Sequence, residues 1–530
     1  GQHSGGMVIC AGQLDSVVPL EPAAMPGRVV VQWDKDDCAH MGIIKVDLLG
    51  LGMMAVLEDS LDLIRQHYGE EVDLAHLPPN DPAVYEALEK ADTVGMFQVE
   101  SRAQMATLPR LRPRTFYDLV VQVAIIRPGP IVGNMVHPYI RRHQGKEPPD
   151  YMHPSLEPVL KRTLGVPLFQ EQLLRMAMIA AGFSGGEAEE LRRAFGFKRA
   201  EARMPEVEVK LRRGMERNGI TGKVQDAIVH SITSFALYGF PESHAASFAL
   251  LSYASAYLKC HYLAAFTAAL LNNQPMGFYH PSTILKDAQR HGLKVRPIDV
   301  ACSGWLCAVE DGPKGEKCVR LGLRYVRGLR EEAGRAIVRE RQRTPFCSIA
   351  NLARRVPELR KDEMRRLAQV GALNFIGKVQ GSNAKVQGAP EESRLGTLDF
   401  GLWTGRQRRH RRGALWQAER AAQPAGPLLE DLPEPDASCP LAPMQPEERT
   451  SADFRGTGLT LGPHPMWHRR AELNRIAVLR AGDLRHLPNE PLSHSDSIQR
   501  LNQALGNTFI EPDEQLVARF VEEINGSRLE

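Results

Sequence analysis

The sequence predicts an α+β protein of several domains in which helices predominate. Its 530 residues, 43% of them hydrophobic and 24% charged, suffice for several packed cores, and the length suggests roughly three or four domains. Short apolar runs between turn residues open the chain, whereas most of the remaining chain has the apolar spacing of helices. A wholly disordered chain is therefore excluded.

The N-terminal residues predict a small piece of sheet. Residues 1–50 contain apolar runs at Met7–Cys10, Val29–Trp33 and Ile43–Leu48, separated by Gly-, Pro- and Asp-rich turns. Such runs are typical of strands. From Leu51 to about Pro275 the apolar residues recur at helical spacing, which predicts a large, mostly helical region.

The later part of the chain changes character several times. Residues 286–376 mix short strands with paired helices, and residues 377–413 are Gly-rich and polar, which predicts a linker. This linker ends in the basic run Arg406–Arg412, and the Pro-rich stretch Pro424–Pro446 comes after it. Residues 490–530 again have helical spacing.

Composition limits the classes of function. A formal net charge of +3 and a pI near 8.4 mean that nucleic-acid affinity would come from local basic patches. The eight cysteines lack zinc-site spacing, so we expect reduced thiols in a cytoplasmic protein. No signal-peptide pattern is present, and Lys259 and His261 interrupt the most apolar stretch, so we expect no membrane span. The sequence begins with Gly1, immediately before a strand-like run, which leads us to expect a missing upstream segment.

The last N-terminal strand carries two charged residues. Strand alternation puts Lys45 and Asp47 on one face and Ile44, Val46 and Leu48 on the other. Two-metal phosphoryl transfer needs carboxylates on a rigid element and a cation near the triphosphate. A solvated face of a half-exposed strand would show the same pattern.

Further motifs occur in fixed order along residues 1–376. They are His3-Ser4-Gly5-Gly6, Ile44–Leu51, Met96–Arg102, Arg127-Pro128-Gly129-Pro130, Phe169–Gln172, Leu191–Ala194 and Tyr238–His244. This series resembles the palm and fingers of bacterial C-family DNA polymerases, the DNA polymerase III alpha subunit family, and is most like its error-prone branch. The resemblance implies the end of a nucleotidyltransferase-like palm sheet and then large helical fingers.

The resemblance assigns Asp47 as the third catalytic aspartate and a Mg²⁺ ligand, with Lys45 as the neighbouring cation. The family keeps its other two aspartates in a D-x-D motif upstream of the His-x-Gly-Gly strand, and this sequence starts after that motif. The aspartates between the predicted strands are in the wrong place to replace them: Asp34, Asp36 and Asp37. Because one carboxylate does not assemble a two-metal site, we expect the chain alone to be inactive.

The resemblance also implies contacts of the fingers with nucleotide or primer. Prolines on both sides of Gly129 fix a tight turn that would present Arg127 to phosphate. The basic cluster at Leu191–Arg199 would face the nucleotide, although a solvated helix face is the alternative. The candidates are Arg102, Arg127, Gln170, Arg192, Arg193, Lys198, Arg199, Ser243 and His244.

Several of these candidates also have structural readings. Glu100 with Arg102, and the polar run Gln170–Gln172, could equally form structural ion pairs. Ser243 fits a helix N-cap and Gly239 the C-cap of the helix before it. His244 is then a candidate contact at a joint between two helices.

Two later segments resemble the hairpins of a tandem helix-hairpin-helix unit, whose turn amides bind DNA phosphates without reading bases. They are Arg324–Arg330 and Ala368–Leu373. The first has Arg330 where the family often has Gly, which weakens the expectation of a backbone-amide contact and puts a side-chain cation there instead. The DNA-binding candidates are Arg327, Gly328, Arg330 and Gly371.

These expectations combine into a domain plan: palm 1–50, fingers 51–285, end of fingers and hairpins 286–376, linker 377–413, connector 414–489 and a non-family helical tail 490–530. The connector assignment depends on Gly456–Met466, which resembles the segment before the oligonucleotide-binding barrel of the error-prone branch. The expected partners are primed DNA, dNTPs, a missing N-terminal half, the sliding clamp and mutasome accessory proteins. A replicative alpha-subunit fragment and a non-catalytic DNA-binding subunit are the alternatives.

Overall fold

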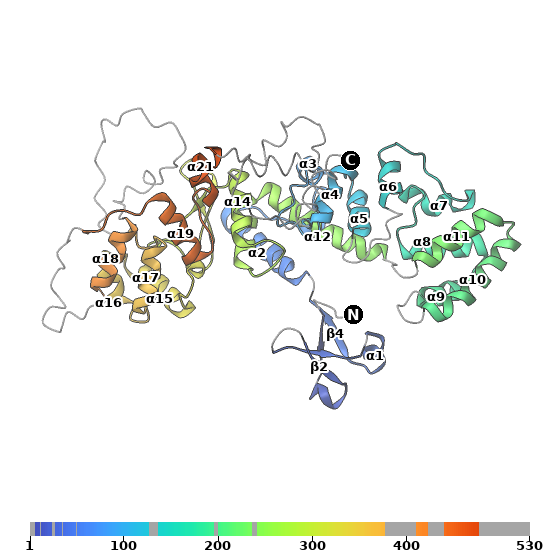
Figure 1. The fold of residues 1–530 in the computed structure, drawn as a ribbon, viewed down its shortest axis with the longest axis horizontal. Coiled ribbons are helices and arrows are strands. Elements are labelled where there is room, and N and C mark those ends of the chain that lie inside the picture. Colours follow the sequence, from blue (N-terminus) through green and yellow to red (C-terminus); the bar gives the residue numbers. More distant parts are fainter. Residues whose placement is uncertain are drawn as a thin grey trace. The chain divides into compact units, whose positions relative to one another are not determined.

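The computed structural model describes residues 6–10, 12–23, 27–33, 35–48, 50–126, 136–194, 200–235, 241–376, 410–421 and 439–475. The chain divides into two compact units: unit 1 is Gly1–Arg296 with Ser303–Gly322, and unit 2 is Pro297–Cys302 with Leu323–Glu530. Helices predominate and the strands form only small sheets (Figure 1), which confirms the predicted fold class. Within these ranges no helix is long and apolar enough to cross a membrane.

Two short antiparallel sheets form the N-terminal part of unit 1. β1 (Gly6–Ile9) pairs with β4 (Ile44–Asp47), and β2 (Leu20–Pro22) pairs with β3 (Val29–Val31). The three apolar runs therefore form strands, as predicted. β2 and the short helix α1 (Lys35–His40) were not predicted, because Glu and Pro or several charged residues break the apolar pattern there.

A first helical core forms where α12 packs across α3 and α5. Leu88, Leu119 and Tyr253 are among its buried side chains. Next to this core, α13 packs along α2, and α14 packs against α13. The helices of this part are α2 (Leu51–Tyr68), α3 (Pro82–Glu89), α4 (Arg102–Leu111), α5 (Phe116–Ile125), α6 (Val136–His143), α12 (Glu242–His261), α13 (Leu263–Asn272) and α14 (Pro281–Arg290).

A second helical core lies between α8, α10 and α11. Leu173, Met176, Leu211 and Ile228 are fully buried in it. The approach of α10 to α8 requires Gly214, because a Cβ there would lie 2.0 Å from the Ala181 carbonyl oxygen. The helices of this group, drawn from teal to green in Figure 1, are α7 (Glu157–Leu160), α8 (Gln170–Ala181), α9 (Gly185–Ala194), α10 (Ala200–Arg217) and α11 (Gly222–Phe235).

A three-stranded sheet completes unit 1. β7 (Lys317–Arg320) lies in its centre, parallel to β5 (Val295–Arg296) and antiparallel to β6 (Ala308–Asp311). Both β6 and β7 pack against α13. The mixture of short strands and helices predicted for residues 286–376 is confirmed.

Unit 2 consists of short helices with α17 packed against α18 and α19. The first helices confirm the predicted pairs around the two hairpins. α18 begins at Arg411, so the linker predicted to run to residue 413 ends earlier in the described structure. The elements are η5 (Leu323–Tyr325), α15 (Glu331–Arg343), α16 (Ile349–Arg355), α17 (Lys361–Gln369), α18 (Arg411–Ala421), α19 (Pro446–Thr457), α20 (Pro465–His468) and α21 (Arg470–Arg475).

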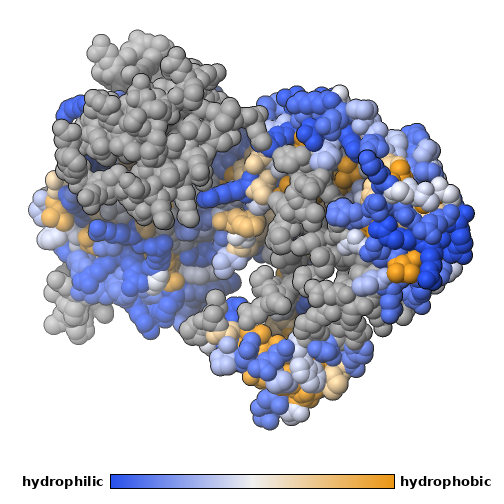
Figure 2. Space-filling model, turned by 45° about the vertical axis from the view of Figure 1, so that its right-hand side comes forward, coloured by the Kyte–Doolittle hydropathy of each residue, from blue (hydrophilic) through white to orange (hydrophobic). Residues whose placement is uncertain are grey.

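The surface is mostly hydrophilic on the face drawn in Figure 2, with small, separate hydrophobic patches among the coloured residues. All eight cysteines fall within the described ranges as free thiols. Predictions that fall outside those ranges include most of the 377–413 linker, the 490–530 helix and the Gly239 cap.

Candidate nucleic-acid interface

β4 carries the predicted catalytic pair at the end of the N-terminal sheet. Lys45 is exposed and lies opposite Val8, and Asp47 lies opposite Gly6. Directly opposed residues share a face of an antiparallel sheet, so Val8 lies beside Lys45 on the same face. The structure describes the backbone of Asp47 and not its side chain, so its metal role stays a prediction.

Glu100 is a buried hub of the fingers. Its carboxylate, 6% exposed, accepts from the Gly95 N–H at 2.8 Å and from the Phe278 N–H, and the Tyr279 hydroxyl donates to its carbonyl at 3.0 Å. Burial raises the pKa of Glu100. The backbone hydrogen bonds to its carboxylate lower the pKa but do not offset the effect of burial. Among the described residues it has no arginine partner, so the alternative of a Glu100–Arg102 ion pair is wrong.

The residues after Glu100 present a cation. The Ser101 hydroxyl caps α4 by accepting from the Gln104 N–H at 3.3 Å. Arg102 is therefore the first residue of α4, where it is exposed. Its guanidinium has no ion-pair or hydrogen-bond partner in the part of the chain that the structure describes, so it is available to a phosphate.

One side of α12 fixes the turn that carries Phe97. The Ser252 hydroxyl donates to the Phe97 carbonyl at 2.8 Å, and the Phe97 N–H donates to the Ser255 hydroxyl at 3.0 Å. One helical turn further on, the Lys259 ammonium donates to the Val94 carbonyl at 2.9 Å. Side chains at this spacing lie on one face of a helix, so α12 holds the backbone of this turn at several points.

His244 lies at the start of the same side of α12. It is exposed, and its ring meets the edge of the Phe248 ring at a centroid distance of 4.3 Å. The Phe248 ring lies 5.5 Å from that of Phe97. The His244 ring, for which a nucleotide contact is predicted, is thus positioned by its packing against Phe248.

Ser243 is not the N-cap of α12, contrary to prediction. The helix begins at Glu242 with Pro241 in the cap position, and Ser243 is exposed in the first turn. The Glu242 N–H instead donates to the Glu171 carboxylate at 3.0 Å. A tertiary contact from α8 has replaced the local cap.

Glu171 and Gln172 of α8 therefore have structural roles. The Gln172 side chain, 6% exposed, accepts from the Phe169 N–H at 3.1 Å and donates to the Thr163 hydroxyl at 2.8 Å. Gln170 opens α8 and is half-buried. Its contact with nucleotide stays a prediction.

Five basic candidates receive no structural description of their side chains. Arg127, Lys198 and Arg199 lie outside the described ranges. Arg192 and Arg193 belong to α9, of which only the backbone is described at those positions. α5 ends at Ile125, shortly before Arg127 in sequence, and α6 begins after it, at Val136. Asp118 of α5 and His143 of α6 are in contact, with 3.2 Å between Oδ1 and Nε2.

The first hairpin presents Arg327 and Gly328 to solvent. Gly328 has a φ of +75°, and a Cβ at this position would lie 1.3 Å from Nη1 of Arg366. The Arg327 N–H donates to the Gly456 carbonyl at 2.8 Å, so this amide is not available to a phosphate. No partner of the Arg327 guanidinium exists among the described residues, which favours a side-chain contact with DNA.

Arg330 joins the two hairpins. Its Nε and backbone N–H both donate to Oε1 of Glu363 at 3.0 Å, and Nη2 donates to Oε2 at 3.1 Å. Burial acts to raise the pKa of Glu363, but the hydrogen bonds from Arg330 and from the Arg360 N–H outweigh it and lower that pKa. The cation predicted for DNA is thus engaged inside the unit, and its contact with phosphate has no geometric support.

The second hairpin turn is covered by α18. Gly371 has a φ of +85°, and a Cβ there would lie 2.9 Å from Nε of Arg411. The Arg411 guanidinium also pairs with Asp453 at 2.7 Å, with both side chains largely buried. The end of the basic run is therefore structural rather than solvated.

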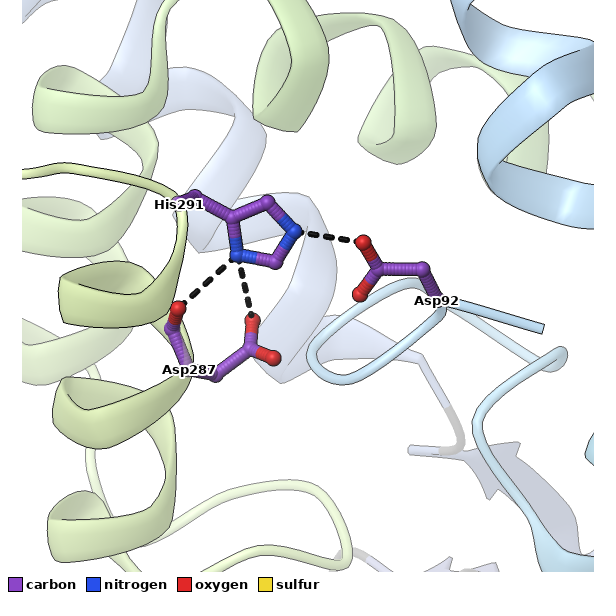
Figure 3. A group of neighbouring side chains, drawn as sticks. All are labelled: Asp92, Asp287 and His291. Atoms are coloured by element: carbon purple, nitrogen blue, oxygen red, sulfur yellow. Dashed lines mark hydrogen bonds and ion pairs between the residues drawn. The ribbon is translucent and has the colours of Figure 1, made fainter. Parts of the chain in front are cut away.

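One further charged group could suggest a metal site. Asp92, Asp287 and His291 offer ligand atoms within 4.8 Å of one another, and His291 bonds both aspartates (Figure 3). However, the Lys259 ammonium lies 2.8 Å from Asp287 and 3.6 Å from Asp92. Since a cation already neutralises these carboxylates, the group is an ion network joining α12, α14 and the turn after α3.

Comparison with known proteins agrees with this arrangement. The family model described as "Bacterial DNA polymerase III alpha NTPase domain" matches residues 1–50, the finger domain of the same subunit matches residues 53–219, and a helix-hairpin-helix motif matches residues 292–382. The chain belongs to the DNA polymerase III alpha family. The matched segments agree with the order of palm, fingers and hairpins predicted from the motifs.

Error-prone DNA polymerases are among the relatives of this member of the DNA polymerase III alpha family. That of Alkalilimnicola ehrlichii is 45% identical over 514 residues, which cover 96% of this chain and 47% of the relative. That of Anaeromyxobacter dehalogenans is 45% identical over 542 residues, with 98% and 45% covered. The chain thus spans about half the length of these relatives. At 98% coverage, the second match includes most of residues 490–530, which the motifs did not connect with the family.

Sequence reasoning missed several residues of this alpha-family interface. Lys259 was seen only as an interruption of an apolar stretch, although a charge within such a stretch signals a buried partner. Arg366 gave no signal, because its place over Gly328 depends on the approach of the two hairpins.

Proposed function

We propose that the chain is part of an error-prone DNA-directed DNA polymerase, which adds dNTPs to a primer as directed by a template. The observation that carries this proposal is the 45% identity over 96% of the chain to a protein named error-prone DNA polymerase. Damage-induced translesion synthesis is the corresponding physiological role. The sliding clamp and mutasome accessory proteins are the corresponding partners in the cytoplasm.

Within this enzyme the fingers would hold nucleotide and primer. Arg102 is exposed and without a partner among the described residues, Gln170 is the first residue of α8, and His244 lies in the first turn of α12. Arg127, Arg192, Arg193, Lys198 and Arg199 complete the proposed basic set. The hairpin unit would grip the DNA backbone through Arg327, with Gly328 and Gly371 shaping the turns.

Mg²⁺ is the cofactor that this function requires, because it neutralises charge on the transferring phosphoryl group. The sheet of β1 and β4 offers one carboxylate, Asp47, as its donor set. One carboxylate does not fit a two-metal centre. Activity therefore requires further carboxylates from polypeptide beyond these 530 residues, and the chain alone should not extend a primer.

Reconstitution tests this proposal. The chain is mixed with the part of the Alkalilimnicola ehrlichii relative that precedes the matched region, and extension of a labelled primer with dNTPs and Mg²⁺ is measured. We expect extension by the mixture only, and a loss of roughly a hundred-fold or more in Asp47→Asn without a change in melting temperature. Asp15→Asn, an exposed aspartate of the same N-terminal part, is the matched control. Extension by the chain alone, or by the Asp47→Asn mixture, contradicts the proposal.

A non-catalytic DNA-binding subunit is the second candidate, favoured by the exposed Arg327 in a compact hairpin unit. DNA binding by the chain without extension in any mixture would support it.

A further inference from the structure

Phe278 has an exposure that folding does not explain. It is the most exposed of the large hydrophobic side chains that the structure describes, at 74%. Burying such a ring would stabilise the fold. A single exposed apolar residue is common and carries nothing by itself, so the surroundings of the ring decide its meaning.

The backbone on both sides of Phe278 is held firmly. Its N–H donates to the buried carboxylate of Glu100, and the hydroxyl of the next residue, Tyr279, donates to the Glu100 carbonyl at 3.0 Å. Gly277 has a φ of +70°, and a Cβ there would lie 3.2 Å from Oε1 of Glu100. Ahead of it, Met276 packs against Gly52 of α2. The loop is thus fixed while the ring projects into water.

The same hub also presents a cation. Directly after Glu100 come the Ser101 cap and Arg102, which is exposed and has no partner among the described residues. Burial raises the pKa of the Tyr279 hydroxyl, and the nearby charges acting on it include those of Glu100 and Arg102. Arg102 and Phe278 are therefore both attached to Glu100: Arg102 follows it by two residues, and Phe278 and Tyr279 donate hydrogen bonds to it.

An exposed aromatic ring and an exposed guanidinium that has no partner among the described residues, both attached to the Glu100 hub, fit one class of ligand. Single-stranded nucleic acid alternates flat apolar bases with phosphates, and proteins bind it by stacking bases on aromatic rings beside basic groups. In a duplex the base faces are already stacked and cannot cover a ring. Glu100 is buried and its carboxylate accepts hydrogen bonds from backbone N–H groups, so it is not itself exposed to a ligand.

We propose that Phe278 and Arg102 form a binding site for unpaired DNA, in which a base of the single-stranded template stacks on Phe278 and a neighbouring phosphate pairs with Arg102. This inference rests on the proposed function, because a single-stranded template is the ligand only if the chain is part of a DNA polymerase. It adds the loop of residues 276–279 to the interface.

Fluorescence anisotropy of a short dye-labelled oligothymidine with the full chain tests the site. Phe278→Ala should raise Kd roughly five- to a hundred-fold, because aromatic stacking of one base is worth about 1–3 kcal/mol. Phe278→Leu, which keeps apolar bulk without an aromatic face, should lose nearly as much, and Phe278→Trp should bind at least as well as the original chain. Arg102→Ala should flatten the dependence of log Kd on log salt by about 0.7.

Two controls complete the test. Binding of a blunt duplex should be the same in the Phe278 variants and the original chain. Trp467→Ala removes another exposed aromatic ring, 59% exposed, and should leave the oligothymidine Kd unchanged. Since both side chains are exposed, loss of folding is not expected, and circular dichroism verifies this.

The outcomes separate this inference from the proposed function. Unchanged oligothymidine binding in Phe278→Ala, retained affinity in Phe278→Leu, or an equal loss on duplex overturns the template site. If reconstituted extension fails while the Phe278 variants behave as expected, the single-strand site stands and the polymerase proposal fails. If extension depends on Asp47 but the Phe278 variants bind normally, only the site fails.

Discussion

Two arginines of the first hairpin show how burial separates structural from ligand-binding charge. Arg330 pairs with Glu363, whose side chain is 2% exposed, and four hydrogen bonds converge on that carboxylate. Arg327, three residues earlier, is exposed and has no such partner in the described structure. A buried carboxylate is costly to deprive of its partner, whereas an exposed cation is free to meet a phosphate.

We expect Glu363→Gln to destabilise the hairpin unit by roughly 1.5–3 kcal/mol, because the hydrogen bonds from Arg330 lose their charged acceptor. Thermal unfolding should then begin several degrees lower. The matched control is Glu331→Gln, which removes a surface pair with Arg335 whose side chains are 55% and 65% exposed, and should cost less than about 1 kcal/mol. Equal melting of both variants would contradict the structural role.

At the scale of elements, α12 acts as the spine of the fingers. It packs across α5 and α3, and one side of it holds the Phe97 turn through Ser252, Ser255 and Lys259. The same side begins with His244. The geometry of the predicted nucleotide contact therefore depends on side chains far along the helix.

We expect Ser255→Ala to loosen the Phe97 turn, since it leaves the Phe97 N–H without its acceptor at a cost of about 1–3 kcal/mol. Hydrogen exchange of peptides covering residues 92–100 should show faster exchange. Ser247→Ala is the control on the same helix, because its hydroxyl bonds only the Ser243 carbonyl within the helix. If both variants exchange alike, α12 does not hold the turn.

A second prediction for elements concerns acid stability. Burial acts to raise the pKa of Asp118, but hydrogen bonds from His143, the Arg114 N–H and Thr115 outweigh it and lower the value from 3.8 to about 2. A depressed carboxyl pKa contributes stability that is present above pH 3.8 and is lost as the pH falls toward 2, here about 2 kcal/mol.

Acid unfolding measured by circular dichroism tests this contribution. Asp118→Asn should lower stability at neutral pH and flatten its pH dependence between 3.8 and 2. Asp226→Asn removes a surface partner of Arg212, with side chains 65% and 35% exposed, and should keep the original pH dependence. A steep acid transition that survives in Asp118→Asn would rule out Asp118 as its source.

For the whole molecule, a net charge of +3 means that DNA affinity cannot come from a global field. Local contacts with phosphates remain, and each releases condensed counterions. This physics leads to strong salt dependence without sequence preference.

We therefore expect the chain to bind two unrelated duplexes with similar Kd values that rise steeply with salt. Arg327→Ala should weaken both equally and flatten the log Kd against log salt slope by about 0.9. Arg343→Ala, an exposed arginine at the far end of α15 that pairs with Glu340, is the control. Salt-independent binding, or a change in sequence preference, would show that the hairpin does not contact phosphates.

The sequence by itself determined the fold class, the order of palm strands, fingers and hairpins, and the family. The spacing of apolar residues distinguishes strands from helices locally, and the order of motifs along the chain can be recognised without knowing any contacts. The residues named for catalysis and DNA binding came from the same motifs. For Lys45, Arg102, His244 and Arg327, the structure finds exposed side chains.

Only the tertiary structure decided which charged and polar residues are engaged. Ser is a residue type that often caps helices, but at the start of α12 it is the Glu171 carboxylate of α8 that accepts the hydrogen bond from the Glu242 N–H. Arg is a residue type that often binds phosphate, but Arg330 is paired with Glu363, which is 33 positions away in sequence and 3.0 Å away in space. Partners brought together by packing cannot be seen in local sequence, because burial and proximity depend on how distant helices meet.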